Sequence, residues 1–390
     1  MAPQPVPGLG LVLTGGGART AYQVGVLLAV RDWLEAPRRS PFSIITGTSA
    51  GAINAGVMAA HAGSYSHGVE GLAAVWRGLT VADVFRCDRV ALYGRALRWV
   101  WTLLRGGLGP HNPRALLDNR PLRQLLERHV NFARIALQVH RGALDAVAIT
   151  ASGYNSGRGV AFYQSGNGIA PWQRERMLSQ PTLLTLDHIM ASVAIPLLFE
   201  AVRIGNDWYG DGAMRDRAPL STAVNLGARR LLVVSTRNND PVPPPQPPPY
   251  PQLGKIAGYV LDSLFMDGIG PDLEHLQALN ALARAAEQPR QPPQAHPPRP
   301  IDVCVLTPSV DLRDLAARHT ARFPTPVRRL FGRIGAFGEL SPLPSYLLFD
   351  GAFCGELIEL GHADAQQRKD DIMAVLTPPT QANSAGTGQA

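Results

Sequence analysis

Short apolar runs alternate along the chain with segments in which apolar residues recur at helical spacing. Short runs rich in β-branched residues predict strands that are buried on both faces. They lie at residues 9–13, 44–46, 143–150, 160–163, 230–235 and 301–306. Apolar residues on one side of a helical repeat predict amphipathic helices. They lie at residues 21–34, 52–60, 116–130, 186–194 and 220–226. The chain is therefore expected to combine buried strands with amphipathic helices.

Composition divides the later part of the chain. Proline dominates two segments, 241–251 and 288–300, which favour polyproline linkers. The segment between them predicts one or two amphipathic helices. With 390 residues and 45% hydrophobic content, the chain can bury one large core. The expected parts are a main domain over 8–236, a proline-flanked helical insert over 237–300, a returning strand with a helical region over 301–376, and a disordered tail over 377–390.

The stretch Ile44-Ile45-Thr46-Gly47-Thr48-Ser49-Ala50-Gly51 places a Gly-x-Ser-x-Gly motif between a predicted strand and a predicted helix. A nucleophile elbow requires that context. Ser49 would stand at a sharp turn in a strained backbone conformation, with Gly47 and Gly51 small enough to let strand and helix close around it. The following helix would direct its N-terminal amides toward a developing negative charge. The motif therefore predicts that Ser49 is a nucleophile.

A glycine-rich loop, Thr14-Gly15-Gly16-Gly17-Ala18-Arg19-Thr20, follows the first predicted strand. Three consecutive glycines leave backbone amides uncovered at the start of a helix, so the loop can hold an anion. The anion is either a cofactor phosphate or the oxygen of a tetrahedral intermediate. The dinucleotide-binding pattern fits only in its first half, because Thr20 stands where its last small residue is needed. We favour the oxyanion hole, because it also gives the Ser49 motif a role.

Positive charge comes almost entirely from arginine. The formal net charge is +7, and Lys255 and Lys369 are the only lysines. Arginine forks onto phosphate oxygens, which suggests phosphate recognition, but a general arginine-rich composition explains the same numbers. No RNA- or DNA-binding motif accompanies the charge, so nucleic acid is not expected as a partner.

A basic, tryptophan-rich segment covers residues 76–131. Between Arg86 and Arg134 there are ten arginines and three acidic residues, around an apolar cluster that includes Trp99 and Trp101. A basic helix with tryptophan on its apolar side can lie in a membrane interface. An ordinary helix over the active site, with solvated arginines, explains the pattern equally well. A lid on a lipid enzyme would satisfy both interpretations.

The three cysteines, Cys87, Cys304 and Cys354, are too few and too far apart for a disulfide framework or a zinc site. The first ten residues have neither a positive n-region nor a long apolar core, so no signal peptide is expected. The longest apolar stretches are too short to span a bilayer. These features predict a cytoplasmic protein that is soluble or peripheral to a membrane.

A serine hydroxyl needs a base that accepts its proton. The histidines that follow Ser49 have poor settings for that role, since His296 lies in a proline tract and His188 and His275 lie in helical segments. His362 has the least unfavourable setting. Surface or helix-capping roles are the expectation for all four.

Asp211 is a different candidate for the base. It follows Trp208-Tyr209-Gly210 and precedes Gly212-Ala213, a tight turn that would leave its carboxylate projecting from the chain. Such a stretch is also typical of a surface turn, and the residues alone favour that simpler interpretation.

Three segments together resemble the patatin-like lipid acyl hydrolases. They are Gly15-Gly16-Gly17-Ala18-Arg19, then Gly47-Thr48-Ser49-Ala50-Gly51 about 30 residues later, and Asp211-Gly212-Ala213 far downstream. Supporting similarity lies in Ala191-Ser192, Ile195-Pro196 and Tyr209. The resemblance covers about residues 8–236, with weaker similarity from residue 301 and over 345–365.

The resemblance implies an α/β protein with a three-layer α/β/α fold and a mostly parallel central sheet. It implies a Ser–Asp dyad in which Ser49 attacks an ester carbonyl and Asp211 is the general base. Amides of Gly16, Gly17 and Ala18 would hold the oxyanion, with Arg19 supporting the loop. No metal or organic cofactor is implied. Thr20 and Ala213 replace glycines that are common in the family, and both replacements leave the loop amides in place.

The leading hypothesis is a serine esterase that hydrolyses lipid acyl esters, either glycerophospholipids or lysophospholipids. The basic segment fits a peripheral contact with an anionic membrane. One alternative is a hydrolase of other acyl esters or polyesters with the same dyad. Another is a membrane-binding scaffold without turnover. A dinucleotide-dependent oxidoreductase would need nucleotide binding, which is not expected. No protein partner follows from the sequence.

Overall fold

The computed structural model describes residues 6–104, 114–166, 168–174, 176–238, 250, 253–264, 268–286, 300–333, 335–337 and 341–377. The predicted proline linkers at 241–251 and 288–300 and the predicted tail at 377–390 lie almost entirely outside these residues.

The strands are β1 (Val6–Leu13), β2 (Phe42–Thr48), β3 (Ala146–Gly153), β4 (Gly159–Ser165), β5 (Met177–Pro181), β6 (Val202–Ile204), β7 (Asp207–Asp211), β8 (Arg230–Val234) and β9 (Asp302–Leu306). The helices before β4 are η1 (Gly17–Thr20), α1 (Ala21–Trp33), α2 (Ala50–Ala60), α3 (Tyr65–Gly78), α4 (Val81–Val84), α5 (Arg89–Leu104), α6 (Arg120–His129) and α7 (Phe132–His140). The later helices are α8 (Leu186–Ser192), η2 (Gly212–Met214), α9 (Pro219–Asn225), α10 (Leu253–Leu264), α11 (Ile269–Ala286), α12 (Leu312–His319), η3 (Thr320–Arg322), α13 (Thr325–Arg333), α14 (Leu343–Leu347), α15 (Gly351–Gln367) and α16 (Lys369–Leu376).

One sheet organises the described residues. Its nine strands include the path β5-β4-β3-β2-β1-β8-β9, and β7 pairs with both β3 and β6. The five neighbours β3, β2, β1, β8 and β9 are parallel, whereas β4 and β7 are antiparallel to β3. Parallel strands end at the same edge of a sheet, so the carboxyl ends of β1 and β2 lie together.

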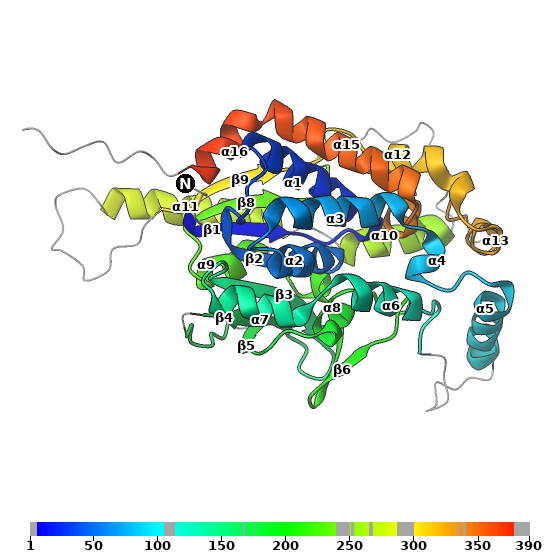
Figure 1. Cartoon of the computed structure of the whole chain (residues 1–390). Coiled ribbons are helices and arrows are strands. Elements are labelled where there is room, and N and C mark those ends of the chain that lie inside the picture. The colour runs from blue at the N-terminus through cyan, green and yellow to red at the C-terminus, as the bar shows by residue number, and fades with distance from the viewer. Residues whose placement is uncertain are drawn as a thin grey trace, which may run out of the picture.

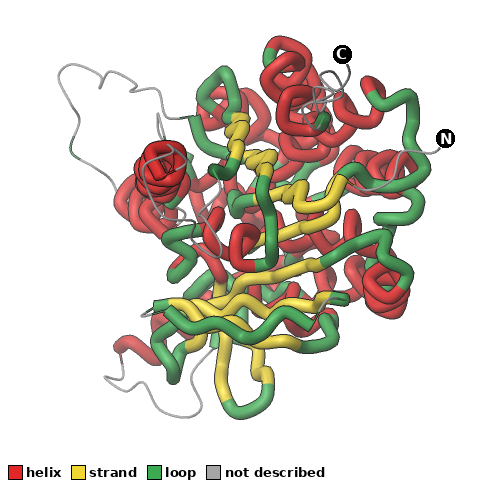
Figure 2. Tube along the Cα trace, turned by 90° about the vertical axis from the view of Figure 1, so that its left-hand side faces the viewer, coloured by secondary structure: helices red, strands yellow, loops and turns green. Residues whose placement is uncertain are grey.

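The two faces of the sheet are buried by different helices. Successive side chains of a strand point to opposite faces. In β8, Leu232 and Val234 join the larger core with α1, α2, α3 and α15, whereas Leu231 and Val233 join a smaller core with α9 and α11. Figure 1 labels these helices, and in Figure 2 the strands run between helices on either side. The predicted three-layer α/β/α fold with a mostly parallel sheet is confirmed.

Two elements differ from the expectation, a helix that begins late and a strand that was not predicted. The helix expected over 116–130 begins at Arg120, because the amides of Leu116 and Leu117 donate to the carbonyl oxygens of Leu197 and Leu198 at 2.8 and 2.9 Å. After this contact, Leu197 has a positive φ of 66°, and the segment that follows it forms a strand only at Val202–Ile204. Strand β5, with few β-branched residues, was not predicted.

The C-terminal helix α15 packs directly along α1. A Cβ atom added at Gly25 would lie 2.0 Å from the Ile358 carbonyl oxygen, and one added at Gly361 would lie 2.1 Å from that of Tyr22. The Tyr22 hydroxyl also donates to Asp364 Oδ2 at 3.0 Å. Residues near the end of the chain therefore cover the helix that follows the glycine-rich loop.

Candidate functional site

Ser49 stands at a strained turn between β2 and α2, as the elbow motif predicts. Its φ of 55° and ψ of −133° lie in a region that side chains rarely adopt. The Ser49 amide donates to Ser192 Oγ at 2.8 Å, and the Ser192 hydroxyl donates to the Thr150 carbonyl oxygen at 2.6 Å. The hydroxyl of Ser192 therefore joins the elbow to β3 and holds the strained turn in place.

Strand β3 brings the two halves of the predicted dyad together. Thr48 pairs with Thr150 in the ladder between β2 and β3, and Asp211 pairs with Ala151 in the ladder between β7 and β3. Antiparallel β7 thus continues along β3 from the point where β2 ends. The Ser49 hydroxyl donates to Asp211 Oδ2 at 2.6 Å.

The Asp211 carboxylate is buried and held in one orientation. Its residue is 1% exposed, and its second oxygen, Oδ1, accepts from the Ala213 amide at 2.9 Å. The Asp211 amide donates to the Ala194 carbonyl oxygen at 2.9 Å. Burial raises the pKa of Asp211 to about 7, against the opposing effects of the bonds from Ser49 and Ala213. The carboxylate can therefore both accept and release a proton near neutral pH.

The glycine-rich loop enters η1 beside this pair. Gly17 has a φ of +56°, and a Cβ atom there would lie 2.2 Å from the Tyr346 carbonyl oxygen, so only glycine fits. The amides of Gly17 and Ala18 belong to the first turn of η1, where helical N–H groups have no acceptor within the helix. The Thr20 hydroxyl donates to the Gly17 carbonyl oxygen at 2.7 Å. The Thr20 side chain therefore braces the turn in which the loop ends.

Close backbone approaches fix the other predicted glycines. A Cβ atom added at Gly51 would lie 2.3 Å from the Leu13 carbonyl oxygen, so α2 begins against the end of β1. At Gly47 it would lie 2.6 Å from the Gly51 carbonyl oxygen, and at Gly212 it would lie 2.1 Å from that of Thr150. Gly15 accepts a bond from the Thr236 hydroxyl through its carbonyl oxygen at 2.6 Å. All three motifs thus converge on one place.

Arg19 is buried and supports the loop through the helix α14. Its Nε and Nη2 donate to Ser345 Oγ at 2.9 and 2.6 Å, and its Nη1 donates to the Tyr346 hydroxyl at 3.1 Å. The guanidinium carbon lies 3.9 Å from the centre of the Tyr346 ring, and Nη1 lies 3.8 Å from Asp262 Oδ1. Spacing along the chain does not connect Ser345 or Asp262 with the loop, because both lie hundreds of residues away from it.

A second polar chain that the sequence did not predict ties the loop to α2 and α3. Gln23 Nε2 donates to the Thr14 carbonyl oxygen at 2.8 Å, and Asn54 Nδ2 donates to Gln23 Oε1 at 2.9 Å and to the Thr20 carbonyl oxygen at 3.1 Å. Trp76 Nε1 donates to Asn54 Oδ1 at 3.0 Å. The sequence does contain a signal for this chain of hydrogen bonds, because the polar residues Gln23 and Asn54 stand among apolar residues in predicted helices.

Of the four histidines considered as a base, the three that the structure describes do not join the site. His188 Nδ1 accepts from the Thr185 amide at 3.0 Å and caps α8, and His362 Nε2 lies 3.1 Å from Asp32 Oδ2 on the surface. His275 is exposed on α11, and His296 lies outside the described residues. In the described part of the chain, no cluster of three or more His, Cys, Asp or Glu side chains is arranged to hold a metal ion.

The basic segment forms α5 and its neighbours. Figure 1 shows α5 standing at the edge of the molecule near α13 and α4. Several of its apolar side chains face solvent, including Leu97 at 68% and Leu104 at 77% exposure. Some arginines are paired rather than only solvated, because Arg95 lies 3.1 Å from Asp118 and Arg123 lies 2.5 Å from Asp187. Among the described helices, none has the length and apolarity needed to cross a membrane.

Comparisons with solved structures find distant similarity. VipD from Legionella pneumophila is 12% identical, with a TM-score of 0.32, over 88% of this chain and 67% of that one. The human GIVD cytosolic phospholipase A2, in complex with methyl gamma-linolenyl fluorophosphonate and terbium chloride, is 18% identical, with a TM-score of 0.43, over 95% of this chain. This chain spans 59% of the length of the human chain. The type III effector ExoU is 14% identical, with a TM-score of 0.27, over 94% of this chain and 79% of that one.

Comparison with family models gives a more direct result. The model described as patatin-like phospholipase matches residues 11–224, which is more than half of the chain and includes all three motifs. A search of curated proteins found no match. The chain therefore belongs to the patatin-like phospholipase family, and by that membership it is a lipid ester hydrolase.

Proposed function

We propose that Ser49 and Asp211 form the catalytic dyad of a phospholipase A or lysophospholipase. The observation that carries this proposal is the 2.6 Å bond from the Ser49 hydroxyl to a buried carboxylate oxygen. A hydroxyl that already directs its proton at a base with a pKa near 7 is prepared to attack an ester carbonyl. No third residue is needed to orient Asp211, because the Ala213 amide fixes its other oxygen.

In the first step, Ser49 Oγ attacks the ester carbonyl carbon while its proton passes to Asp211 Oδ2. The carbonyl oxygen becomes an oxyanion, which the amides of Gly16, Gly17 and Ala18 stabilise. The tetrahedral intermediate collapses, and protonated Asp211 gives its proton to the departing alcohol. A fatty acyl ester on Ser49 remains.

In the second step, Asp211 accepts a proton from water, and the resulting hydroxide attacks the acyl carbon. The same loop amides hold the second oxyanion. Asp211 then returns the proton to Ser49 Oγ, and the fatty acid leaves. The two steps consume one water and restore both side chains.

A lipid surface as the source of substrate is supported by α5. Exposed apolar side chains such as Leu97 and Leu104 share this helix with arginines, a combination suited to an anionic interface. The substrate class proposed here is therefore a glycerophospholipid or lysophospholipid in a membrane or micelle.

The test compares fatty acid release from phospholipid and lysophospholipid micelles by the wild type, Ser49→Ala and Asp211→Asn. We expect each variant to lose at least ~1,000-fold in kcat, because each removes a group that acts in both steps. Ser263→Ala and Asp370→Asn are matched controls at exposed positions and should retain full activity.

Labelling with a fluorophosphonate probe separates the remaining alternatives. Ser49 should label in the wild type, and labelling should disappear in Ser49→Ala. A wild type that does not label would favour a silent scaffold. Full activity in either dyad variant would refute the mechanism, and hydrolysis limited to soluble esters or polyesters would refute the lipid assignment.

A further inference from the structure

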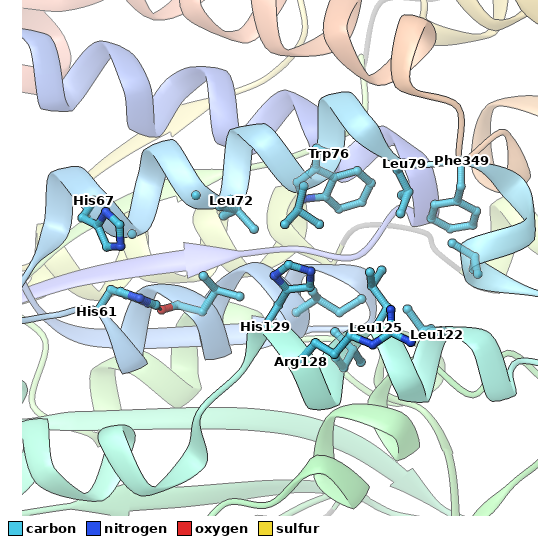
Figure 3. Close-up of a pocket in the computed structure, with 17 residues that line it drawn as sticks. His61, His67, Leu72, Trp76, Leu79, Leu122, Leu125, Arg128, His129 and Phe349 are labelled. Atoms are coloured by element: carbon cyan, nitrogen blue, oxygen red, sulfur yellow. Dashed lines mark hydrogen bonds between the residues drawn. The ribbon is translucent and has the colours of Figure 1, made fainter.

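A narrow apolar cleft lies between α2, α3 and α6, apart from the dyad. Its volume is about 220 Å³, and most of its seventeen lining residues are apolar. Figure 3 shows Trp76, Leu79 and Phe349 at one end and His61 and His67 at the other. We call it the α2–α3 cleft. A dry apolar cavity of about 150 Å³ already binds benzene, so this cleft has room for part of an alkyl chain.

Basic side chains alone supply the charge of this cleft. Four of the lining residues are basic, namely His61, His67, Arg128 and His129, and none is acidic. We call these four the basic rim. Burial lowers the pKa of His61, so Arg128 supplies the permanent positive charge. An apolar slot with a cationic rim is complementary to an amphiphile with one chain and a negative head.

The cleft is distinct from the catalytic site. Neither Ser49 nor Asp211 lines it, and the glycine-rich loop does not reach it. Ile53 and Val57 of α2 line the cleft. They follow Ser49 at intervals of four residues, so they lie on one face of the helix. His61 is the C-cap of α2, at the opposite end of the helix from Ser49 and about 18 Å along its axis. A head group at His61 is therefore too far away to be the ester that Ser49 attacks.

We propose that the α2–α3 cleft binds a free fatty acid, with its alkyl chain against Leu72 and Trp76 and its carboxylate at the basic rim. The chemistry of the cleft selects an anionic amphiphile with a single chain. The choice of a fatty acid among such amphiphiles rests on the proposed function, because hydrolysis releases one from the same molecule.

The affinity should depend on chain length. Each methylene buried in an apolar site raises affinity by about fourfold. Hexanoate, octanoate and decanoate should therefore bind with increasing affinity until the cleft is full. Decanol, which lacks the charge, should bind more weakly than decanoate.

Binding is measured by calorimetric titration of decanoate into the full-length Ser49→Ala protein, so that the result does not depend on hydrolysis. Gly71 lines the mouth of the cleft, and a Cβ atom there would meet nothing within 4 Å. Gly71→Leu should fill the mouth without a clash and weaken decanoate binding by at least ~10-fold. Gly78 lies on the same helix but does not line the cleft, and a Cβ atom there would also meet nothing within 4 Å, so Gly78→Leu should bind decanoate normally.

The rim is tested with Arg128→Gln, which should weaken decanoate several-fold and leave decanol unchanged. Arg141→Gln is its control, since Arg141 does not line the cleft. Equal decanoate affinity in the Gly71→Leu and Gly78→Leu proteins would overturn the proposal. The proposal would also be overturned if Gly71→Leu changed only the chain length of the esters that the active enzyme prefers. The cleft would then hold the acyl chain of the substrate.

Discussion

Asp211 shows how the surroundings of one side chain change its affinity for a proton. A carboxyl in water is ionised well below neutral pH, but burial disfavours the charged form and raises the pKa of Asp211 to about 7. The bonds from Ser49 and Ala213 favour the carboxylate and keep the pKa from rising further. The base is therefore matched to the pH at which it would work.

This pKa predicts the pH dependence of the reaction. Only ionised Asp211 accepts the Ser49 proton, so kcat/KM should rise about tenfold per pH unit below pH ~7 and level off above it. The measurement uses a short, uncharged, water-soluble ester between pH 5 and 9, where surface binding plays no part. A profile that is flat from pH 5 to 8 would contradict Asp211 as the base.

At the scale of elements, the short helix α14 decides the shape of the glycine-rich loop. Ser345 accepts two bonds from Arg19 and donates to the Pro342 carbonyl oxygen at 2.6 Å. The Tyr346 carbonyl oxygen closes on Gly17. Residues more than 300 positions along the chain therefore position the amides proposed to hold the oxyanion.

Ser345→Ala tests this support. The substitution leaves the buried Arg19 guanidinium short of an acceptor, so the loop should lose its fixed position. We expect kcat to fall by ~10-fold or more while KM changes little, since the loop acts mainly in the transition state. Ser341→Ala is the control, because the Ser341 hydroxyl is buried without a hydrogen-bond partner among the described residues. Equal kcat in the two variants would contradict a positioning role.

Strand β3 positions the two residues of the proposed dyad in a comparable way. Along one side of β3, the first residues pair with β2 and the last residues pair with β7. This arrangement brings Ser49 and Asp211 into contact. The sequence predicts the end of β2 and a turn at Asp211, but it contains no information about which strands are neighbours. The late start of α6 has the same origin, because the amides of Leu116 and Leu117 take acceptors in a distant segment.

At the scale of the whole molecule, α5 gives the protein an exposed apolar edge. Leu97 and Leu104 are each more than two-thirds exposed, and Arg95 on the same helix is bound by Asp118. An edge of this kind is costly in water and is stabilised in a membrane interface.

The double variant Leu97→Ser/Leu104→Ser should weaken binding to vesicles containing phosphatidylserine by ~10-fold or more, since two apolar side chains lose their place in the interface. Leu183→Ser is the control, because Leu183 is 69% exposed and follows β5 rather than lying on α5. Vesicle sedimentation measures the binding, and hydrolysis of a soluble ester should be unchanged. Equal sedimentation of the double variant and the control would refute membrane contact through α5.

The sequence by itself determined most of the buried strands, the helices beside the motifs, the nucleophile motif, the glycine-rich loop and the family, because these depend on local spacing and on residue types within a few positions. Tertiary structure alone decided which strands lie side by side, where Arg19 finds its partners and how deeply Asp211 is buried. The pKa of Asp211 depends on solvent exclusion by the whole fold. For that reason the residues of the Gly-Asp-Gly turn by themselves resemble an ordinary surface turn, and in the sequence only the family resemblance singles out Asp211.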